Sequence, residues 1–255
     1  MDVVTLGPLR VRRVVKTTSK VAANPSGSLT VVLMHGYGAP GDDLVSLSDV
    51  IEAPVGTTFL FPEAPSQIDD PGMLATLGDA RQWWPIDAGR FQRAMMTGKV
   101  EELVAEVPEG IADARASVIA MLDAYERESG VPGDRIVVGG FSQGSMLATD
   151  VVLRSRLTDA SGADTSKRPV AGLVVMSGTL LASGEWLPLM VERKGLPVFQ
   201  SHGTEDPLLP FAIAERLRGA FEEAGMPVTF SQFDGGHGIT MGVMHDLGAW
   251  LCGRI

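Results

Sequence analysis

The alternation of short apolar runs with amphipathic segments constrains the fold of this chain more than any other feature. The apolar runs cover residues 29–34, 57–62, 135–140, 170–176, 196–202 and 226–233. Such runs are typical of strands buried on both faces of a parallel sheet. Residues 109–130 and 211–225 instead have the periodicity of amphipathic helices and end at glycine. The pattern predicts an α/β fold with a mostly parallel sheet and helices on both faces.

The remaining segments predict one domain rather than two. Residues 11–16, VRRVVK, predict an antiparallel strand at an edge of the sheet, and the small polar residues 158–168 predict a surface loop. The interval between the runs at 170–176 and 196–202 is too short for an independent cap domain. We therefore expect a single domain over residues 1–255, elaborated by an irregular loop at about 63–108.

Composition and charge argue against several classes of function. The formal net charge of −10 leaves no basic stripe for nucleic acid or for anionic lipid. One cysteine, Cys252, excludes a disulfide framework, and the four histidines lack metal-ligand spacing, so we expect no metal site. The chain has no secretory leader and no apolar run of about 18 residues. We expect a cytoplasmic protein without a membrane span.

The segment GGFSQGSM, residues 139–146, places a serine between glycines at the end of an apolar run. A sharp turn from strand to helix strains the backbone of the central residue and exposes its side chain. Small residues are needed two positions before and after it, and Gly140 and Gly144 occupy those positions around Ser142. An ordinary turn with Ser142 as a helix N-cap is the alternative. The strand before and the helix after favour a nucleophile.

A serine nucleophile needs a base and an acid that orients the base. In this architecture they follow the serine in the order acid, then histidine. Asp206 follows the run at 196–202, with Glu205 as a rival for the same role, and His237 lies among glycines after the run at 226–233. His202 and His245 are interpreted as structural. We therefore predict a catalytic triad of Ser142, Asp206 and His237.

Two backbone amides would stabilise the oxyanion that forms during acyl transfer. The residue after the nucleophile, Gln143, supplies one of them by position. The glycine-rich loop after the run at 29–34 supplies the other, and Tyr37 is the candidate.

Two alternatives from other functional classes stay open at this stage. Residues 36–41, GYGAPG, match the dinucleotide-binding fingerprint, and Glu63 stands where its ribose-binding acid would be. An NAD-binding oxidoreductase would leave unexplained the segments GGFSQGSM, HGTEDP and DGGHG, which contain Ser142, Asp206 and His237. A non-catalytic protein on a hydrolase scaffold is the second alternative, because fold does not guarantee chemistry.

Five segments together carry a resemblance to a known family: LMHGYGAPGDDL, GVPGDRIVVGGFSQGSMLATDV, AGLVVMSGTL, LPVFQSHGTEDPLLP and GGHGI. On them the chain resembles the acyl-protein thioesterase, or phospholipase/carboxylesterase, family of small α/β-hydrolases. The resemblance implies an α/β-hydrolase fold and cleavage of acyl esters or thioesters without a cofactor. It implies the same triad and the same oxyanion amides. WWPID, residues 83–87, is similar to a family segment beside the acyl site, which makes Trp83 or Trp84 a candidate for substrate binding.

The sequence departs from the family pattern in two places. Residues 88–108 are longer and more apolar than the resemblance predicts, and Ser145 stands where the family has a small glycine or alanine. The first departure leaves the size of the acyl substrate open. It also suggests a homodimer that uses this apolar loop as its face.

Overall fold

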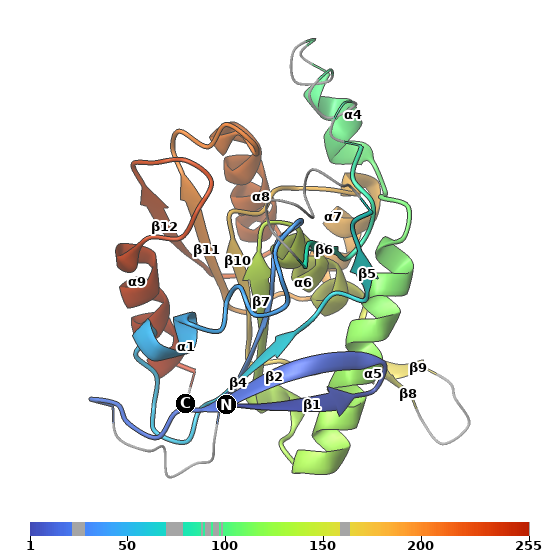
Figure 1. Ribbon diagram of the computed structural model, residues 1–255. Coiled ribbons are helices and arrows are strands. Elements are labelled where there is room, and N and C mark those ends of the chain that lie inside the picture. The colour runs from blue at the N-terminus through green and yellow to red at the C-terminus, as the bar shows by residue number, and fades with distance from the viewer. Residues whose placement is uncertain are drawn as a thin grey trace.

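The computed structural model describes residues 1–21, 29–69, 79–87, 89, 93, 97, 99–158 and 164–254. Its centre is an eight-stranded sheet in the order β1-β2-β4-β3-β7-β10-β11-β12 (Figure 1). The strands are β1 (Asp2–Leu6), β2 (Leu9–Val15), β3 (Thr30–Met34), β4 (Thr58–Pro62), β7 (Ile136–Phe141), β10 (Gly172–Met176), β11 (Val198–Gly203) and β12 (Val228–Phe233). All the apolar runs of the sequence are therefore strands of one sheet.

Within this sheet β2 alone runs against its neighbours, since it pairs antiparallel with both β1 and β4. The expectation of an antiparallel strand over residues 11–16 is confirmed, but its place at the edge is wrong. The edge strand is β1, whose outward residues are exposed and whose sequence gave no clear apolar signal. The hairpin of β1 and β2 therefore contains one strand more than the sequence predicts.

Helices cover both faces of the sheet. The helices of the described residues are α1 (Leu47–Val50), α4 (Val100–Ala105), α5 (Ile111–Ser129), α6 (Gln143–Arg154), α7 (Ser183–Val191), α8 (Phe211–Glu223) and α9 (Met241–Cys252). As predicted, α5 ends at a glycine, and Gly130 has a positive φ of 71° that glycine adopts without strain. In Figure 1, α1 and α9 lie on one side of the sheet and α5 and α6 on the other.

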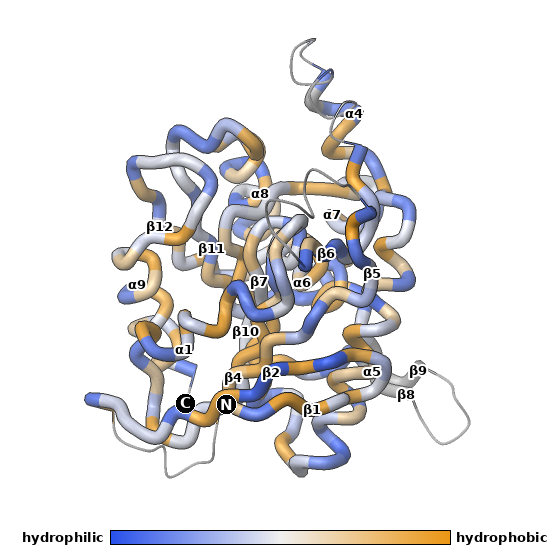
Figure 2. The backbone as a smooth tube through the Cα atoms, viewed as in Figure 1, coloured by the Kyte–Doolittle hydropathy of each residue, from blue (hydrophilic) through white to orange (hydrophobic). Residues whose placement is uncertain are grey.

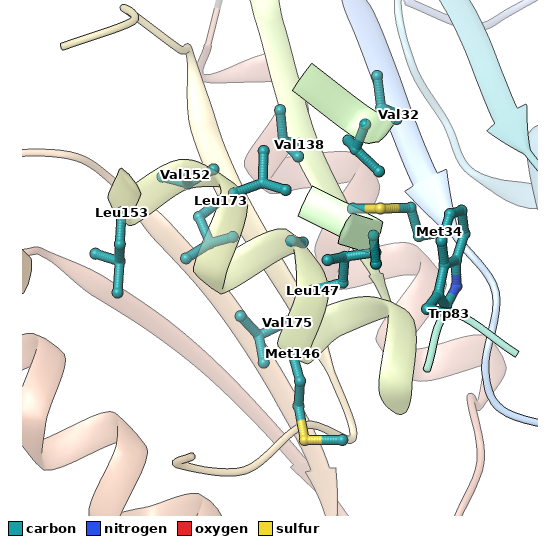
Figure 3. Packing of buried hydrophobic residues seen from close by; sticks show 14 of the residues in the cluster. Val32, Met34, Trp83, Val138, Met146, Leu147, Val152, Leu153, Leu173 and Val175 are labelled. Carbon is teal, nitrogen blue, oxygen red and sulfur yellow. The ribbon is translucent and has the colours of Figure 1, made fainter. Parts of the chain in front are cut away.

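Two apolar clusters fill the space between the sheet and these helices. Alternate residues of one strand serve different clusters, so Val32 and Met34 of β3 pack on the side of α5 to α8, whereas Val31 and Leu33 pack on the side of α9. Figure 3 shows how α6 presents Met146, Leu147 and its later turns to the central strands. The apolar stretches of the tube in Figure 2 follow these strands. The burial on both faces explains the continuous apolar runs.

Two small ribbons lie outside the sheet. β5 (Ser66–Gln67) pairs with β6 (Arg81–Gln82), and β8 (Arg156–Thr158) pairs with β9 (Asp164–Lys167), both antiparallel. The prediction of a loop over residues 158–168 is therefore wrong at its two ends, which form a ribbon. Residues 159–163 lie outside the described residues, as does much of the apolar part of the 63–108 loop.

Candidate active site

The turn between β7 and α6 holds Ser142 in a strained conformation. Its φ is 52° and its ψ is −121°, and its amide donates to the carbonyl oxygen of Met176 at 2.8 Å. A non-glycine residue held at positive φ costs of order 1–3 kcal/mol. The side chain of Ser142 makes no capping hydrogen bond to α6, which argues against the N-cap interpretation. The hydroxyl group of Ser142 is therefore not engaged in capping the helix.

Close packing against the end of β3 explains the two glycines. A Cβ atom at Gly140 would collide with the carbonyl oxygen of Met34, and one at Gly144 would collide with the carbonyl oxygens of Met34 and His35. The turn can approach β3 only if both positions lack a side chain. This contact brings Ser142 beside the loop that follows β3.

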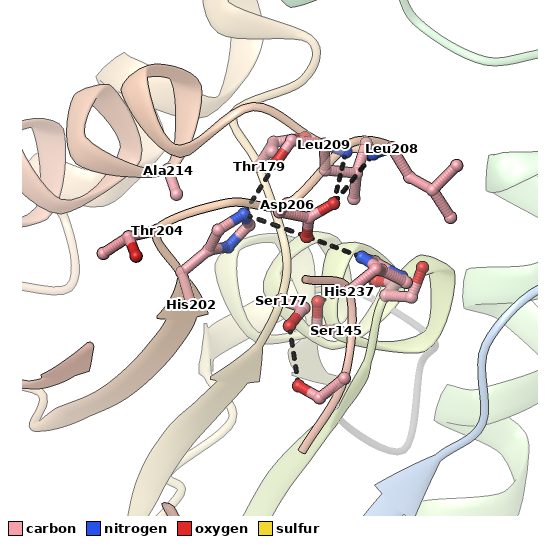
Figure 4. A network of polar contacts seen from close by, with 12 residues as sticks. Ser145, Ser177, Thr179, His202, Thr204, Asp206, Leu208, Leu209, Ala214 and His237 are labelled. Carbon is pink, nitrogen blue, oxygen red and sulfur yellow. Dashed lines mark hydrogen bonds and ion pairs between the residues drawn. The ribbon is translucent and has the colours of Figure 1, made fainter. Parts of the chain in front are cut away.

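Asp206 and His237 form a hydrogen-bonded pair at the carboxyl ends of β11 and β12. His237 Nδ1 lies 2.7 Å from Asp206 Oδ2. The other carboxylate oxygen, Oδ1, accepts the backbone amides of Leu208 and Leu209, each at 2.9 Å. Figure 4 shows the carboxylate between these groups. Glu205, the rival acid in the sequence, has an exposed side chain, whereas Asp206 is buried.

The surroundings of Asp206 favour its ionised form. Burial by itself would raise the pKa of this carboxyl group. Hydrogen bonds from His202 and His237 and from the Leu209 amide act in the opposite direction and hold its pKa well below the usual range. An ionised Asp206 can orient His237 and stabilise a positive charge on its ring.

Ser142 and His237 both line one cavity of about 830 Å³. The ring of Phe141, the residue before Ser142, lies 4.9 Å from the His237 ring between centroids. A hydrogen bond fixes the loop of His237, because the Ser177 hydroxyl donates to the Gly238 carbonyl oxygen at 3.1 Å. The structure thus brings Ser142 and His237 of the predicted triad to one cavity, with Asp206 buried behind His237. Buried apolar side chains form much of its wall: Trp84, Val104, Met146, Leu180 and Ile213.

The loop after β3 reaches the same cavity. Tyr37 lies on the wall, and Gln143, whose amide is the other candidate donor, begins α6. Two backbone hydrogen bonds fix the loop, from Gly38 to the Arg81 carbonyl at 2.8 Å and from Arg81 to the Ala39 carbonyl at 3.2 Å. The first turn of a helix also offers unpaired amides and a positive dipole end to an anion.

His35 supports this loop from beneath, a role that the sequence analysis missed. Its Nε2 accepts the amide of Ala64 at 3.1 Å, so Nδ1 carries the hydrogen and donates to the Gly36 carbonyl at 2.8 Å. Burial lowers the pKa of His35, which favours the neutral ring that this arrangement requires. The signal in the sequence that could have indicated this role is the position of His35 directly after an apolar run.

The side chain of Gln143 fixes the two tryptophans. Its Oε1 accepts the Trp83 amide at 3.0 Å, and its Nε2 donates to the Trp84 carbonyl oxygen at 2.8 Å. Trp84 lines the cavity, as the resemblance implies for one of the pair. Trp83 is not among the described residues that line it, because its indole packs on His35 and donates to the His35 carbonyl at 3.0 Å.

The same loop does not fit the dinucleotide fingerprint. In that fingerprint the glycines open a helix directly, whereas here turns follow residue 36 and α1 begins only at Leu47. The required acid, Glu63, is 6% exposed and pairs with Arg12 at 2.8 Å and with Arg81 at 3.2 Å. Its carboxylate is engaged in ion pairs with these arginines, so the oxidoreductase alternative lacks the acid that would bind the ribose.

A mostly parallel sheet with a strained serine after a central strand, and an acid and a histidine after later strands, defines the α/β-hydrolase class. The sequence profile of the Phospholipase/Carboxylesterase family matches residues 18–252. The chain belongs to this family of ester-bond hydrolases. The predicted family and fold are thereby confirmed.

Individual relatives agree with this assignment. Acyl-protein thioesterase 1 of Neurospora crassa is 29% identical over 216 residues, which are 82% of this chain and 79% of the relative. The Bacillus cereus carboxylesterase structure has a TM-score of 0.67 at 16% identity, covering 97% of this chain and 95% of its own. The structure of Zea mays acyl-protein thioesterase 2 has a TM-score of 0.63 at 21% identity and covers 96% and 98%. These structures share the fold of this chain.

Within the described ranges, no helix is both long enough and apolar enough to cross a membrane.

Proposed function

We propose that the protein is a serine hydrolase that cleaves carboxylic esters or thioesters of acyl groups through a covalent acyl-enzyme. Ser142 is the nucleophile, His237 the general base and Asp206 the acid that orients it. The amides of Tyr37 and Gln143 hold the oxyanion, and Trp84 contacts the acyl group. The protein uses no cofactor.

In the first half of the reaction His237 takes the proton from Ser142 as its oxygen attacks the carbonyl carbon. The oxyanion forms against the Tyr37 and Gln143 amides. His237 then returns the proton to the leaving alcohol or thiol. In the second half His237 activates a water molecule, which releases the acid and restores Ser142.

One observation carries the proposal. His237, which is hydrogen-bonded to the buried Asp206, borders the cavity that the strained Ser142 also borders. In a non-catalytic protein nothing would maintain the strained backbone of Ser142 or the hydrogen bond between the buried Asp206 carboxylate and His237. The family membership supports the same class of reaction.

Ser142→Ala tests the nucleophile. We expect it to lower kcat for p-nitrophenyl acyl esters by at least about a thousandfold while the protein stays folded. The matched control is Ser117→Ala on α5, where the hydroxyl donates to the Asp113 carbonyl outside the cavity. Parent-like turnover by Ser142→Ala would refute the proposal, and so would failure of a fluorophosphonate probe to label Ser142.

Asp206→Asn tests the acid. The asparagine keeps the size of the side chain but does not stabilise the correct tautomer of His237, so we expect a loss in kcat of roughly ten-thousand-fold. Glu205→Gln is the neighbouring control and should leave kcat within about twofold. A larger loss in Glu205→Gln than in Asp206→Asn would assign the acid to Glu205.

The relatives named acyl-protein thioesterases support thioesters of acyl chains as substrates. A series of acyl chain lengths, offered both as oxygen esters and as thioesters, distinguishes short esters from lipid-like acyl groups. The cytoplasmic location and the homodimer stay predictions; residues 88, 90–92, 94–96 and 98 of the segment that suggested a dimer face lie outside the described residues.

A further inference from the structure

A second histidine, His202, contacts the carboxylate of Asp206. Its Nε2 lies 3.3 Å from Asp206 Oδ2 and 2.7 Å from the Leu209 carbonyl oxygen. The side chain comes from β11 and has no exposed surface. Oδ2 therefore lies between two imidazole rings, one facing the cavity and one behind it (Figure 4).

The contacts of His202 define its protonation. The Leu209 carbonyl oxygen can only accept a hydrogen bond, so Nε2 carries a hydrogen. The other nitrogen, Nδ1, is buried and has no hydrogen-bond partner among the described residues. A hydrogen there would be an unsatisfied buried donor and would leave a charged ring in the interior, which is costly. His202 is thus a neutral ring with one N–H group.

His202, Asp206 and Leu209 form a closed set of contacts. The Leu209 amide donates to Asp206 Oδ1 at 2.9 Å, and the Leu209 carbonyl accepts from His202. Leu209 also lines the cavity. The position of the carboxylate and the shape of this part of the wall therefore depend on the same buried ring.

We propose that His202 is a positioning residue for the triad: it fixes the turn of residues 206–209 and shares Asp206 Oδ2 with His237, which limits the base strength of His237. The inference rests on the proposed function. It assigns to His202 a role that the sequence had given to packing alone.

The direction of the effect follows from the hydrogen bonds. Removal of the His202 N–H leaves Asp206 Oδ1 with its two amides, so the carboxylate keeps its contacts within its own turn. Oδ2 then concentrates its negative charge on His237, which favours the protonated imidazole. The pKa of His237 should rise, and the fraction of active base below that pKa should fall.

Other titratable groups near the pair do not explain such a change. Glu205, Asp234 and Glu215 have exposed side chains, and Arg216 of α8 pairs with Glu101. Four carboxylates share the cavity wall with His237: Asp43, Asp87, Glu106 and Glu109. All of these groups are identical in the parent and the variants, so their influence cancels in the comparison.

The test compares His202→Leu with the parent protein. Two readouts are measured: the pH dependence of kcat/KM for p-nitrophenyl butyrate, and the NMR titration of the His237 ring. We expect the apparent pKa of His237 to rise by about half a unit or more, which lowers kcat/KM about threefold at pH values well below it. His245→Leu, at a histidine that is 82% exposed, is the control and should leave both readouts unchanged.

Unchanged readouts in His202→Leu would overturn the proposal, even if the variant is less stable. If His202→Leu does not fold, His202→Gln and His202→Asn replace it. The glutamine amide reaches the position of Nε2 and should keep the parent profile, whereas the shorter asparagine should shift it. Equal profiles in these two variants would equally overturn the proposal.

The two proposals can fail separately. A parent protein that hydrolyses neither esters nor thioesters would refute the proposed function. The NMR titration of His237 would still show whether His202 acts on it through Asp206.

Discussion

At the scale of single residues, Ser142 has a strained backbone conformation that the surrounding fold must stabilise. Its φ of 52° is forced by the turn between β7 and α6 and by the approach to β3. Such strain costs of order 1–3 kcal/mol for a residue with a Cβ atom, and glycine avoids most of it.

We therefore predict that Ser142→Gly is more stable than Ser142→Ala. The relief of strain is opposed by the greater flexibility of glycine in the unfolded chain, and about 1 kcal/mol should remain in favour of glycine. Both variants should be inactive. Chemical denaturation gives the difference in the free energy of unfolding.

The same two substitutions at Ser117 provide the control. Ser117 lies inside α5, where glycine is less favourable than alanine by about 1 kcal/mol, so the order of stability should reverse. The same order at both positions would mean that the φ of Ser142 carries no strain.

The lowered pKa of Asp206 links stability to pH. The ionised carboxylate is better stabilised in the folded protein than in the unfolded chain, so its contribution is fully present above the ordinary value of 3.8. It is lost as the pH falls below that value towards the lower pKa of the folded state.

We predict that the free energy of unfolding lost in Asp206→Asn is largest above about pH 5 and shrinks as the pH falls below 4. Urea denaturation of the parent and the variant at several pH values measures this loss. Asp234→Asn, on an exposed loop, should stay within about 0.5 kcal/mol of the parent throughout. A loss that is constant with pH would contradict the assignment of an ionised Asp206.

At the scale of elements, α4 forms part of the cavity wall and is joined to α8 by a bidentate ion pair. Glu101 accepts two hydrogen bonds from Arg216, at 2.7 and 3.0 Å. Leu103 and Val104 of α4 line the cavity. The side chains of Arg216 and Glu101 are 41% and 80% exposed, so the pair should add little to global stability.

We predict that Arg216→Gln raises KM for long acyl chains several-fold and leaves short-chain esters and the melting temperature nearly unchanged. The reason is that the variant loosens the wall that only a long chain reaches. Steady-state kinetics with acetyl and dodecanoyl esters measures the difference.

Arg218→Gln is the matched control for this prediction. Arg218 pairs instead with Glu222 within α8. An equal effect of both substitutions, or an equal effect on both chain lengths, would show that the ion pair does not hold the cavity wall.

The elements also show what the sequence could and could not predict. Strands and helices were located well because burial on both faces leaves a continuous apolar run in the sequence. The triad candidates were found because the class fixes their order along the chain. β1 was missed because an exposed edge strand lacks this signal.

Contacts between distant residues left no local signal at all. Gln143 was chosen for its backbone amide, yet its side chain also binds the segment of Trp83 and Trp84. Only the folded chain brings those residues together. The choice between the two tryptophans likewise depended on which indole reaches His35, which periodicity does not encode.

At the scale of the whole molecule, the charge of the protein bears on which substrates approach it. The net charge is −10, and the described residues that line the cavity include four carboxylates and no lysine or arginine. Salt screens interactions of this kind, with a Debye length of about 10 Å at 0.1 M.

We predict that thioesters with an anionic thiol part react more slowly than neutral ones at low salt. The ratio of their kcat/KM values should rise roughly threefold between about 0.02 and 0.5 M salt, because screening removes the repulsion. Glu109→Gln should weaken this dependence. Parallel salt profiles for both substrates would show that the acidic wall has no influence.

The order of the strands has a consequence for biosynthesis. The turn of Ser142 belongs to the middle of the sheet, whereas Asp206 and His237 follow β11 and β12, the last strands at one margin. A ribosome delivers the serine first and the histidine much later. Under the proposed mechanism a nascent chain therefore carries Ser142 without its base for a long interval, and we expect reactivity towards acyl groups to begin only when β12 docks.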